Sequence, residues 1–239
     1  MHRGVWDLAP TVAALLAGTT PPVPVPRHQS PRYDRVNCVY AFDQYGRRAL
    51  RVLNKDSPLN DRNELLELPD FRVLARCRKP PCATPPTAAA LSDRFIVWLN
   101  NRSPPHKEAL VHDLASSAYQ ATLRHTQGIS SVVFSPDGRL LATAAGVTVR
   151  LWDPQSGECV RRFKGQRGNV QAIAFHPSGR FLAVACLDET IRFWETASGA
   201  ELGRYAWGAG VAFQIAFSAD GLTAAAATPR AVVVWDVDV

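Results

Sequence analysis

A segment of 41 or 42 residues recurs three times in the second half of this chain, and this period is the strongest constraint on its fold. One repeat position is always phenylalanine, and another is always tryptophan. The phenylalanines are Phe134, Phe175 and Phe217, and the tryptophans are Trp152, Trp194 and Trp235. Because aromatic positions and turns keep the same spacing, the three segments are copies of one structural unit.

Each copy predicts a set of short β-strands. The turns "SPDG", "HPSG" and "SADG" follow the phenylalanines and separate a first strand from a second. Proline presets φ for such a turn, and glycine tolerates a positive φ. The second strands, such as "RLLATAA" and "RFLAVAC", are apolar almost throughout, so both of their faces must be covered. The fourth strand, as in "CVRRFKG", is polar enough to lie at an outer edge. Units of this kind must stack on each other, which is the architecture of a β-propeller.

The motif "FSPDG…TVRLWD" and its two companions resemble WD repeats, a family of β-propellers that serve mostly as rigid platforms for protein partners. The resemblance covers residues 126–239 well and includes Asp153 and Asp236 after their tryptophans. It implies an all-β fold made of four-stranded antiparallel blades. It also implies a non-catalytic platform for protein–protein interaction, which binds through the loops of one rim.

The repeat extends upstream in a weaker form. Residues 71–125 are expected to form one divergent blade, with "DFRVLARC" and "RFIVWLNN" as its first two strands and His112-Asp113 in place of Trp-Asp. Val39–Leu53 and Gly4–Gly18 each resemble a third strand, a turn and a fourth strand. We therefore expect a Pro-rich segment at 1–30, which could be a partial blade, divergent blades at 31–125 and three clear blades at 126–239.

The ring is expected to be small or incomplete, with four to six blades and five favoured. The last unit stops at Val239, directly after its third strand. Candidates for the missing outer strand are Ala49–Leu53, Val36–Phe42 and the segment around Val5–Leu16. The alternative is a fragment of a longer WD-repeat protein, with an open ring that exposes apolar faces and self-associates.

The resemblance also implies a hydrogen-bonded chain in each blade, from a histidine through a serine or threonine to the tryptophan, with an aspartate before the third strand. In this sequence every such chain is broken. Trp152 has His125 and Thr143 but no aspartate in its turn, whereas Trp194 has Asp188 but Gln166 in the histidine position. Trp235 has neither histidine nor aspartate nearby. Apolar packing is therefore expected to hold the blades together.

No motif for an enzyme, a metal or a cofactor is present. The sequence has no Gly-rich phosphate loop, no nucleophile elbow and no His-Glu-x-x-His, and its six histidines lack ligand spacing. The five cysteines include one close pair, Cys77 and Cys82, without a second pair for zinc. We expect reduced thiols in a cytoplasmic protein. No apolar run reaches the roughly 18 residues of a membrane span, and "TVAALLAG" lacks the basic region of a secretory signal.

Two binding surfaces follow from these patterns. The first is the rim formed by the loops before the first strands and between the second and third strands, where Trp207 is either an interface residue or a lid over the core. Its candidates are Trp207, Arg167, Gln166, Asp188, Glu189, Arg230 and His125. The second is a basic patch that could bind nucleic acid or another polyanion, since the net charge of +6 arises entirely within residues 1–125. Its members are Arg47, Arg48, Arg51, Arg72, Arg76, Arg78 and Lys79.

Overall fold

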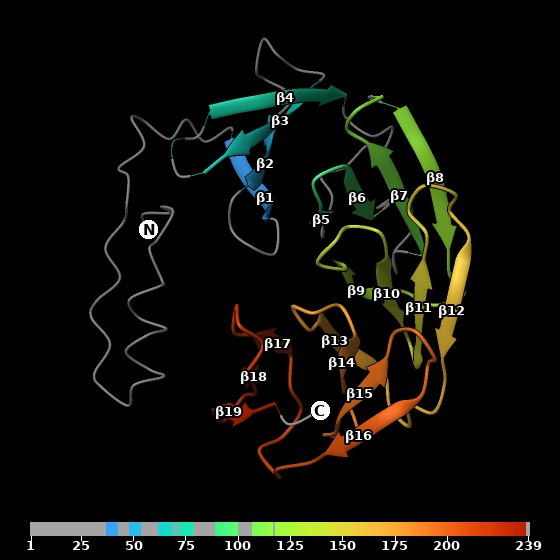
Figure 1. Cartoon of the computed structure of the whole chain (residues 1–239), viewed down its shortest axis with the longest axis vertical. Helices are drawn as coiled ribbons and strands as arrows, with labels where there is room; N and C mark the ends of the chain where they lie inside the picture. Colours follow the sequence, from blue (N-terminus) through green and yellow to red (C-terminus); the bar gives the residue numbers. More distant parts are fainter. Residues whose placement is uncertain are drawn as a thin grey trace. The chain divides into compact units, whose positions relative to one another are not determined.

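A computed structural model describes residues 37–42, 48–53, 62–68, 70, 72–78, 89–99, 107–116 and 118–237. Within these ranges the chain forms β-strands and no helix. The strands lie in the compact unit Cys38–Val239, apart from the first residue of β1. They form five antiparallel sheets that follow one another in chain order around a ring (Figure 1). The fold is therefore a five-bladed β-propeller, as the repeat predicted.

Each of the first four sheets has four strands, and the fifth has three. The first sheet contains β1 (Asn37–Phe42), β2 (Arg48–Leu53), β3 (Arg62–Glu67) and β4 (Arg72–Arg78). The second contains β5 (Ala89–Leu91), β6 (Phe95–Leu99), β7 (Glu108–Asp113) and β8 (Ala118–Arg124). The third contains β9 (Ile129–Phe134), β10 (Leu141–Ala145), β11 (Thr148–Trp152) and β12 (Cys159–Phe163). The fourth contains β13 (Val170–Phe175), β14 (Phe181–Cys186), β15 (Ile191–Glu195) and β16 (Glu201–Tyr205). The fifth contains β17 (Gln214–Phe217), β18 (Thr223–Ala227) and β19 (Val232–Asp236).

Two strand assignments made from the sequence were wrong. The segment 39–53 supplies the first two strands of the first sheet, whereas we expected a third and a fourth strand. The segment 70–77 falls in β4, the last strand of the first sheet, and does not open the second sheet. Both errors have one cause: these strands lack the Trp-Asp and turn motifs that mark position within a blade. The division of the chain at residues 30 and 125 stays a prediction.

The repeat positions predicted from the sequence coincide in the sheet registers. Trp152 pairs with Leu141, Trp194 with Leu182 and Trp235 with Ala224. His112 takes the same place in the second sheet, opposite Ile96. The second strands β10 and β14 are buried along their whole length, as their apolar sequences required.

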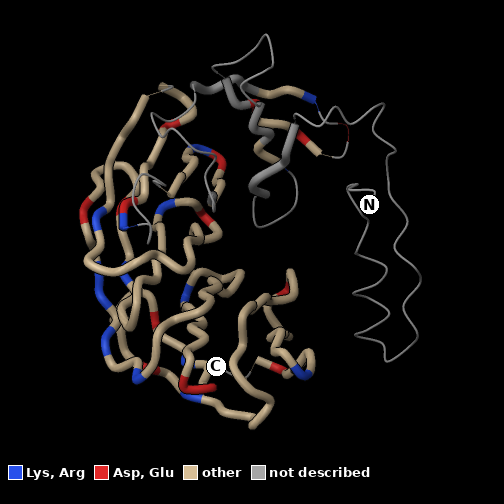
Figure 2. The backbone as a smooth tube through the Cα atoms, turned by 180° about the vertical axis from the view of Figure 1, so that it is seen from behind, with Lys and Arg blue, Asp and Glu red and all other residues tan. Residues whose placement is uncertain are grey.

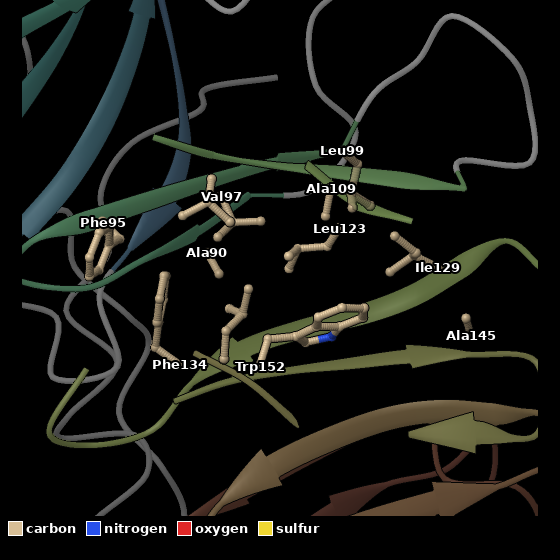
Figure 3. Packing of buried hydrophobic residues seen from close by; sticks show 12 residues of the cluster. Ala90, Phe95, Val97, Leu99, Ala109, Leu123, Ile129, Phe134, Ala145 and Trp152 are labelled. Carbon is tan, nitrogen blue, oxygen red and sulfur yellow. The ribbon is translucent and has the colours of Figure 1, made fainter. Parts of the chain in front are cut away.

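The core consists of apolar layers between neighbouring sheets. Between the second and third sheets, Val97 and Leu123 pack with Phe134 and Trp152 (Figure 3). Similar layers join the third sheet to the fourth and the fourth to the fifth. Leu50 and Leu65 of the first sheet pack with Trp98 of the second. Each sheet thus buries its side chains against its neighbour, which is why a single unit could not fold alone.

The fifth sheet has the order β17-β18-β19, so β19 is its outermost strand among the described residues (Figure 1). Two segments that we considered as its outer strand lie elsewhere, because Val36–Phe42 overlaps β1 and Ala49–Leu53 lies in β2. The third, Val5–Leu16, falls outside the described residues, as does the possible partial blade at Gly4–Gly18.

Candidate functional site

The loops before the first strands and the turns between the second and third strands lie at the same end of each sheet, because neighbouring strands run antiparallel. In the fourth and fifth sheets these are residues 164–169, 187–190, 206–213 and 228–231. We call them the rim loops. They contain six of the seven predicted partner-binding residues, and the seventh, His125, lies in the corresponding loop before the third sheet.

In the fourth sheet the two rim loops are held against each other. The Leu187 backbone N–H donates to the Asn169 carbonyl at 2.8 Å, and the Arg192 guanidinium donates to the Gly165 carbonyl at 2.8 Å. Arg192 is buried and also pairs with Asp188 at 3.2 Å and with Glu201 at 3.5 Å. Two carboxylates and a carbonyl therefore satisfy the buried charge.

These contacts engage the carboxylate of Asp188 within the fold, so its role is structural. Burial alone would raise the pKa of its carboxyl, but hydrogen bonds from the Thr190 hydroxyl and backbone and the nearby Arg192 cation lower the pKa below 3.8. Asp188 is half-buried, and Gln166 and His125 are buried. Three of the predicted rim residues thus face inward.

The other predicted rim residues are exposed. Arg167, Glu189 and Arg230 reach solvent, and Glu189 has a positive φ of 62°, which is uncommon for a residue with a side chain. Trp207 is 40% exposed. Its ring lies 4.7 Å from the Trp235 ring and stacks on Tyr205 at 5.8 Å, with an interplanar angle of 9°. Trp207 therefore covers part of the core while one portion of its ring faces solvent.

No sequence feature indicated that Tyr205 is exposed. Tyr205 ends the outer strand β16, and the residues at its register position in β8 and β12 are Leu123 and Phe163. Leu123 and Phe163 are buried, whereas Tyr205 is 42% exposed. Tyr205, Trp207 and Trp235 together form what we call the aromatic stack.

The hydrogen-bonded chain is partly built in the third sheet and absent from the fourth. Trp152 Nε1 donates to the Thr143 hydroxyl at 2.8 Å, and that hydroxyl shares a hydrogen bond of 3.0 Å with His125 Nε2. Trp194 Nε1 and both amide atoms of Gln166 have no partner among the described residues. The strand register explains the difference. Trp152 lies opposite Leu141 of β10, and Trp194 lies opposite Leu182 of β14. Two positions further along the second strand, β10 has the hydroxyl of Thr143, whereas β14 has the apolar Val184. Sequence reasoning noted the missing histidine but overlooked the missing hydroxyl.

We expect Thr143→Val to lower the free energy of unfolding by about 1–3 kcal/mol, because it leaves Trp152 Nε1 and His125 Nε2 buried without a partner. The reciprocal change, Val184→Thr, supplies a hydroxyl beneath Trp194, and we expect it to stabilise the protein by about 1 kcal/mol. Urea unfolding of both variants measures these effects. If Thr143→Val is as stable as the wild type, the hydrogen bonds among His125, Thr143 and Trp152 contribute nothing to stability.

The basic patch is interleaved with glutamates in the first sheet. Glu64 lies opposite both Arg51 and Arg76, and Glu67 lies opposite both Arg48 and Arg72 in the strand register. Arg72 hydrogen-bonds Glu67, and Arg48 pairs with Asp93 of the neighbouring sheet at 3.0 Å. Arg78 lies in β4, while Arg47 and Lys79 fall outside the described residues. Opposite charges directly across a sheet compensate each other.

Elsewhere on the described sheets, positive and negative residues are both spread along the backbone (Figure 2). The described part of the chain contains no group of three or more potential metal ligands. A cavity of about 460 Å³ lies at the opposite rim, between the turns of the second and third sheets, and Arg94, Ser135 and Asp153 contribute to its lining. In the same portion of the chain, no helix is long and apolar enough to span a membrane.

Comparison with known proteins identifies the repeats. The family model described as "WD domain, G-beta repeat" matches residues 106–153 and 157–195. The target of rapamycin complex subunit wat1 of Schizosaccharomyces pombe is 33% identical over 109 residues, which cover 38% of this chain and 34% of that protein.

Two further relatives have similar coverage. The guanine nucleotide-binding protein subunit beta of Schizosaccharomyces pombe is 30% identical over 87 residues, which cover 36% of this chain and 28% of that protein. Pre-mRNA-processing factor 19 homolog 2 of Arabidopsis thaliana is 33% identical over 137 residues, which cover 54% of this chain and 26% of that protein. The aligned part of the chain thus spans about a third or less of each relative.

Proposed function

Because this chain carries WD repeats on a five-bladed β-propeller, a fold whose relatives fit protein-interaction scaffolds, we propose that it is a non-catalytic platform that binds a partner protein through its rim loops. The proposed contact surface comprises the aromatic stack together with the exposed Arg167 and Glu189. The observation that carries the proposal is the solvent-facing ring of Trp207, held in place by Tyr205 and Trp235.

Physical reasoning supports this surface. An interface gains most from large, rigid side chains whose burial requires little ordering, and tryptophan, tyrosine and arginine dominate measured hot spots. Trp207 already stacks on Tyr205 and contacts Trp235 in a tilted arrangement, so that binding would cost little side-chain entropy. The hydrogen bonds between the rim loops of the fourth sheet hold the neighbouring positions in a defined arrangement. The surface is therefore preorganised.

Affinity capture with quantitative mass spectrometry tests the proposal. The wild-type chain and Trp207→Ala are used as baits in an extract of the source organism. We expect partner recovery to fall at least about tenfold with Trp207→Ala, as for a hot-spot residue. The matched control is Val160→Ala, which truncates an exposed apolar residue on β12, outside the rim loops.

Circular dichroism melting of both variants separates a binding defect from unfolding. If Trp207→Ala captures the same proteins as the wild type while remaining folded, the proposed surface is wrong. Polyanion binding has less support, because Glu64 and Glu67 lie among the arginines of the basic patch. We therefore do not propose it.

A further inference from the structure

An arginine occupies the same place in the third strands of the third and fourth sheets. Arg150 and Arg192 each lie two positions before the tryptophan of their strand. Their guanidinium groups make the same contact, because Arg150 donates to the Arg124 carbonyl at 3.1 Å and Arg192 donates to the Gly165 carbonyl at 2.8 Å. These two carbonyls belong to equivalent positions of the repeat, directly before the buried residue of each rim loop. The two arginines therefore have equivalent surroundings in the backbone.

The two sheets differ in the carboxylates that they supply. Arg192 pairs with Asp188 at 3.2 Å and with Glu201 of the outer strand β16 at 3.5 Å. The turn that carries Asp188 spans residues 187–190, whereas the corresponding turn of the third sheet spans only residues 146–147 and contains no acidic residue. Cys159 takes the register position of Glu201, opposite the tryptophan. The third sheet thus lacks both carboxylates.

The charge of Arg150 is consequently left without a carboxylate among the described residues. Arg150 is half-buried, and its Nε is buried with no hydrogen-bond partner in that part of the chain. Arg162 lies directly opposite on β12, is exposed, and likewise pairs with no acidic residue that the structure describes. Like charges directly across two strands are unfavourable, and a partly buried charge without a counterion destabilises a fold. These two cations call for an anion from outside the sheet.

The two arginines lie toward the outer side of the ring. β12 carries Arg162, β8 contributes the Arg124 carbonyl, and both are outer strands of neighbouring sheets (Figure 1). The side chain of Arg124 pairs with Glu108 at 3.3 Å. β8, β11 and β12 all belong to the unbroken described range 118–237. The surroundings of the two cations are therefore defined by described strands.

We propose that Arg150 and Arg162 form a docking site for glutamate or aspartate side chains in an acidic segment of another protein. The fourth sheet indicates the chemistry of the ligand, because Asp188 and Glu201 supply carboxylates to Arg192 from within the chain. A guanidinium group matches a carboxylate in shape and donates charge-assisted hydrogen bonds to it. The site uses neither the aromatic stack nor the basic patch, whose arginines already lie opposite glutamates.

Fluorescence polarisation with a labelled peptide of four glutamates, at low ionic strength, tests the site, and a peptide of four glutamines is the control probe. Arg162→Gln and Arg204→Gln are matched variants. Each removes one exposed charge from an outer strand, and Arg204 lies opposite Arg192 as Arg162 lies opposite Arg150. We expect the dissociation constant of the glutamate peptide to rise about threefold or more in Arg162→Gln and to stay nearly unchanged in Arg204→Gln.

Cys159→Glu gives the third sheet the carboxylate that Glu201 supplies in the fourth. We expect this side chain to pair with Arg150 and to raise the dissociation constant of the glutamate peptide about tenfold. Cys159→Gln is its control, because glutamine has nearly the same size without the charge, and it should bind the peptide as the wild type does. Circular dichroism melting verifies that each variant is folded.

Three results would overturn the proposal: equal losses in Arg162→Gln and Arg204→Gln, unchanged binding in Cys159→Glu, or a glutamate peptide that binds no better than the glutamine peptide. If a single-stranded oligonucleotide depends on Arg162 more strongly than the peptide does, the site takes phosphate and the carboxylate assignment is wrong. None of these measurements involves Trp207, so the proposed rim surface stands or falls by its own test.

Discussion

Replacing Trp194 with alanine is expected to lower the free energy of unfolding by about 3–5 kcal/mol, as for other large core aromatics. Trp194 is buried in the layer between the third and fourth sheets, where its ring lies 5.6 Å from Phe163. Its removal leaves a cavity that two rigid sheets cannot close, because strand pairing holds both in place. We expect the melting temperature to fall by about 10 °C for a chain of this size.

Trp194→Phe is the control for this substitution. Phenylalanine retains most of the ring and removes the indole N–H, which has no partner among the described residues. We expect a change of less than about 1.5 kcal/mol, as for conservative core replacements. Urea unfolding followed by circular dichroism measures both variants. A melting curve that does not change in Trp194→Ala would show that this residue does not support the core.

Acid is expected to destabilise the protein through His125. Burial, together with the neighbouring Arg150 cation, lowers the pKa of His125 from 6.5 to about 4. The unfolded chain therefore binds this proton more readily than the folded protein does. The contribution of neutral His125 to the free energy of unfolding is fully present above pH 6.5. It declines as the pH falls and is lost near pH 4. The loss amounts to about 3 kcal/mol.

Burial lowers the pKa of His125 because the protonated imidazole would carry a second N–H that finds no acceptor among the described residues. Protonation requires hydrogens on both ring nitrogens, but Nδ1 of His125 is buried and has no partner in the part of the chain that the structure describes, while Nε2 already shares a hydrogen bond with Thr143. Burial also lowers the pKa of His112, so that histidine adds to the effect. The pKa values of the Asp113, Asp137 and Asp188 carboxyls are lowered from 3.8, so their contribution to stability begins to be lost only below about pH 5 and is lost mainly below about pH 4.

Unfolding in urea at pH 7, 6, 5 and 4.5 measures this dependence. His125→Gln is the matched variant, because the chain itself places Gln166 at the equivalent position of the next blade. We expect most of the loss of stability between pH 6.5 and 4.5 to disappear in His125→Gln. An equally steep loss in this variant would assign the acid sensitivity to other groups.

The sequence was sufficient for the repeat, the strand order within the three clear blades and the burial of Trp152 and Trp194, whereas Trp235 is only half-buried. These features follow from local chemistry, since turn residues, alternating strands and apolar second strands each act over a few residues. The same logic failed in the first sheet, where segments 39–53 and 70–77 carry strand propensity without a marker of their place in a blade. Without a marker, strand order depends on which neighbours are available for pairing.

Among the predicted site residues, local chemistry identified the loops but not the direction in which their side chains point. Gln166, Asp188 and Trp207 occupy similar rim loops, yet the first is buried, the second pairs with Arg192 and the third is partly exposed. Burial is decided by the sheet that packs next to each loop, which lies about 40 residues away in the chain. Sequence alone therefore determined the repeating unit, whereas the stacking of neighbouring units decided which side chains remain available to a partner.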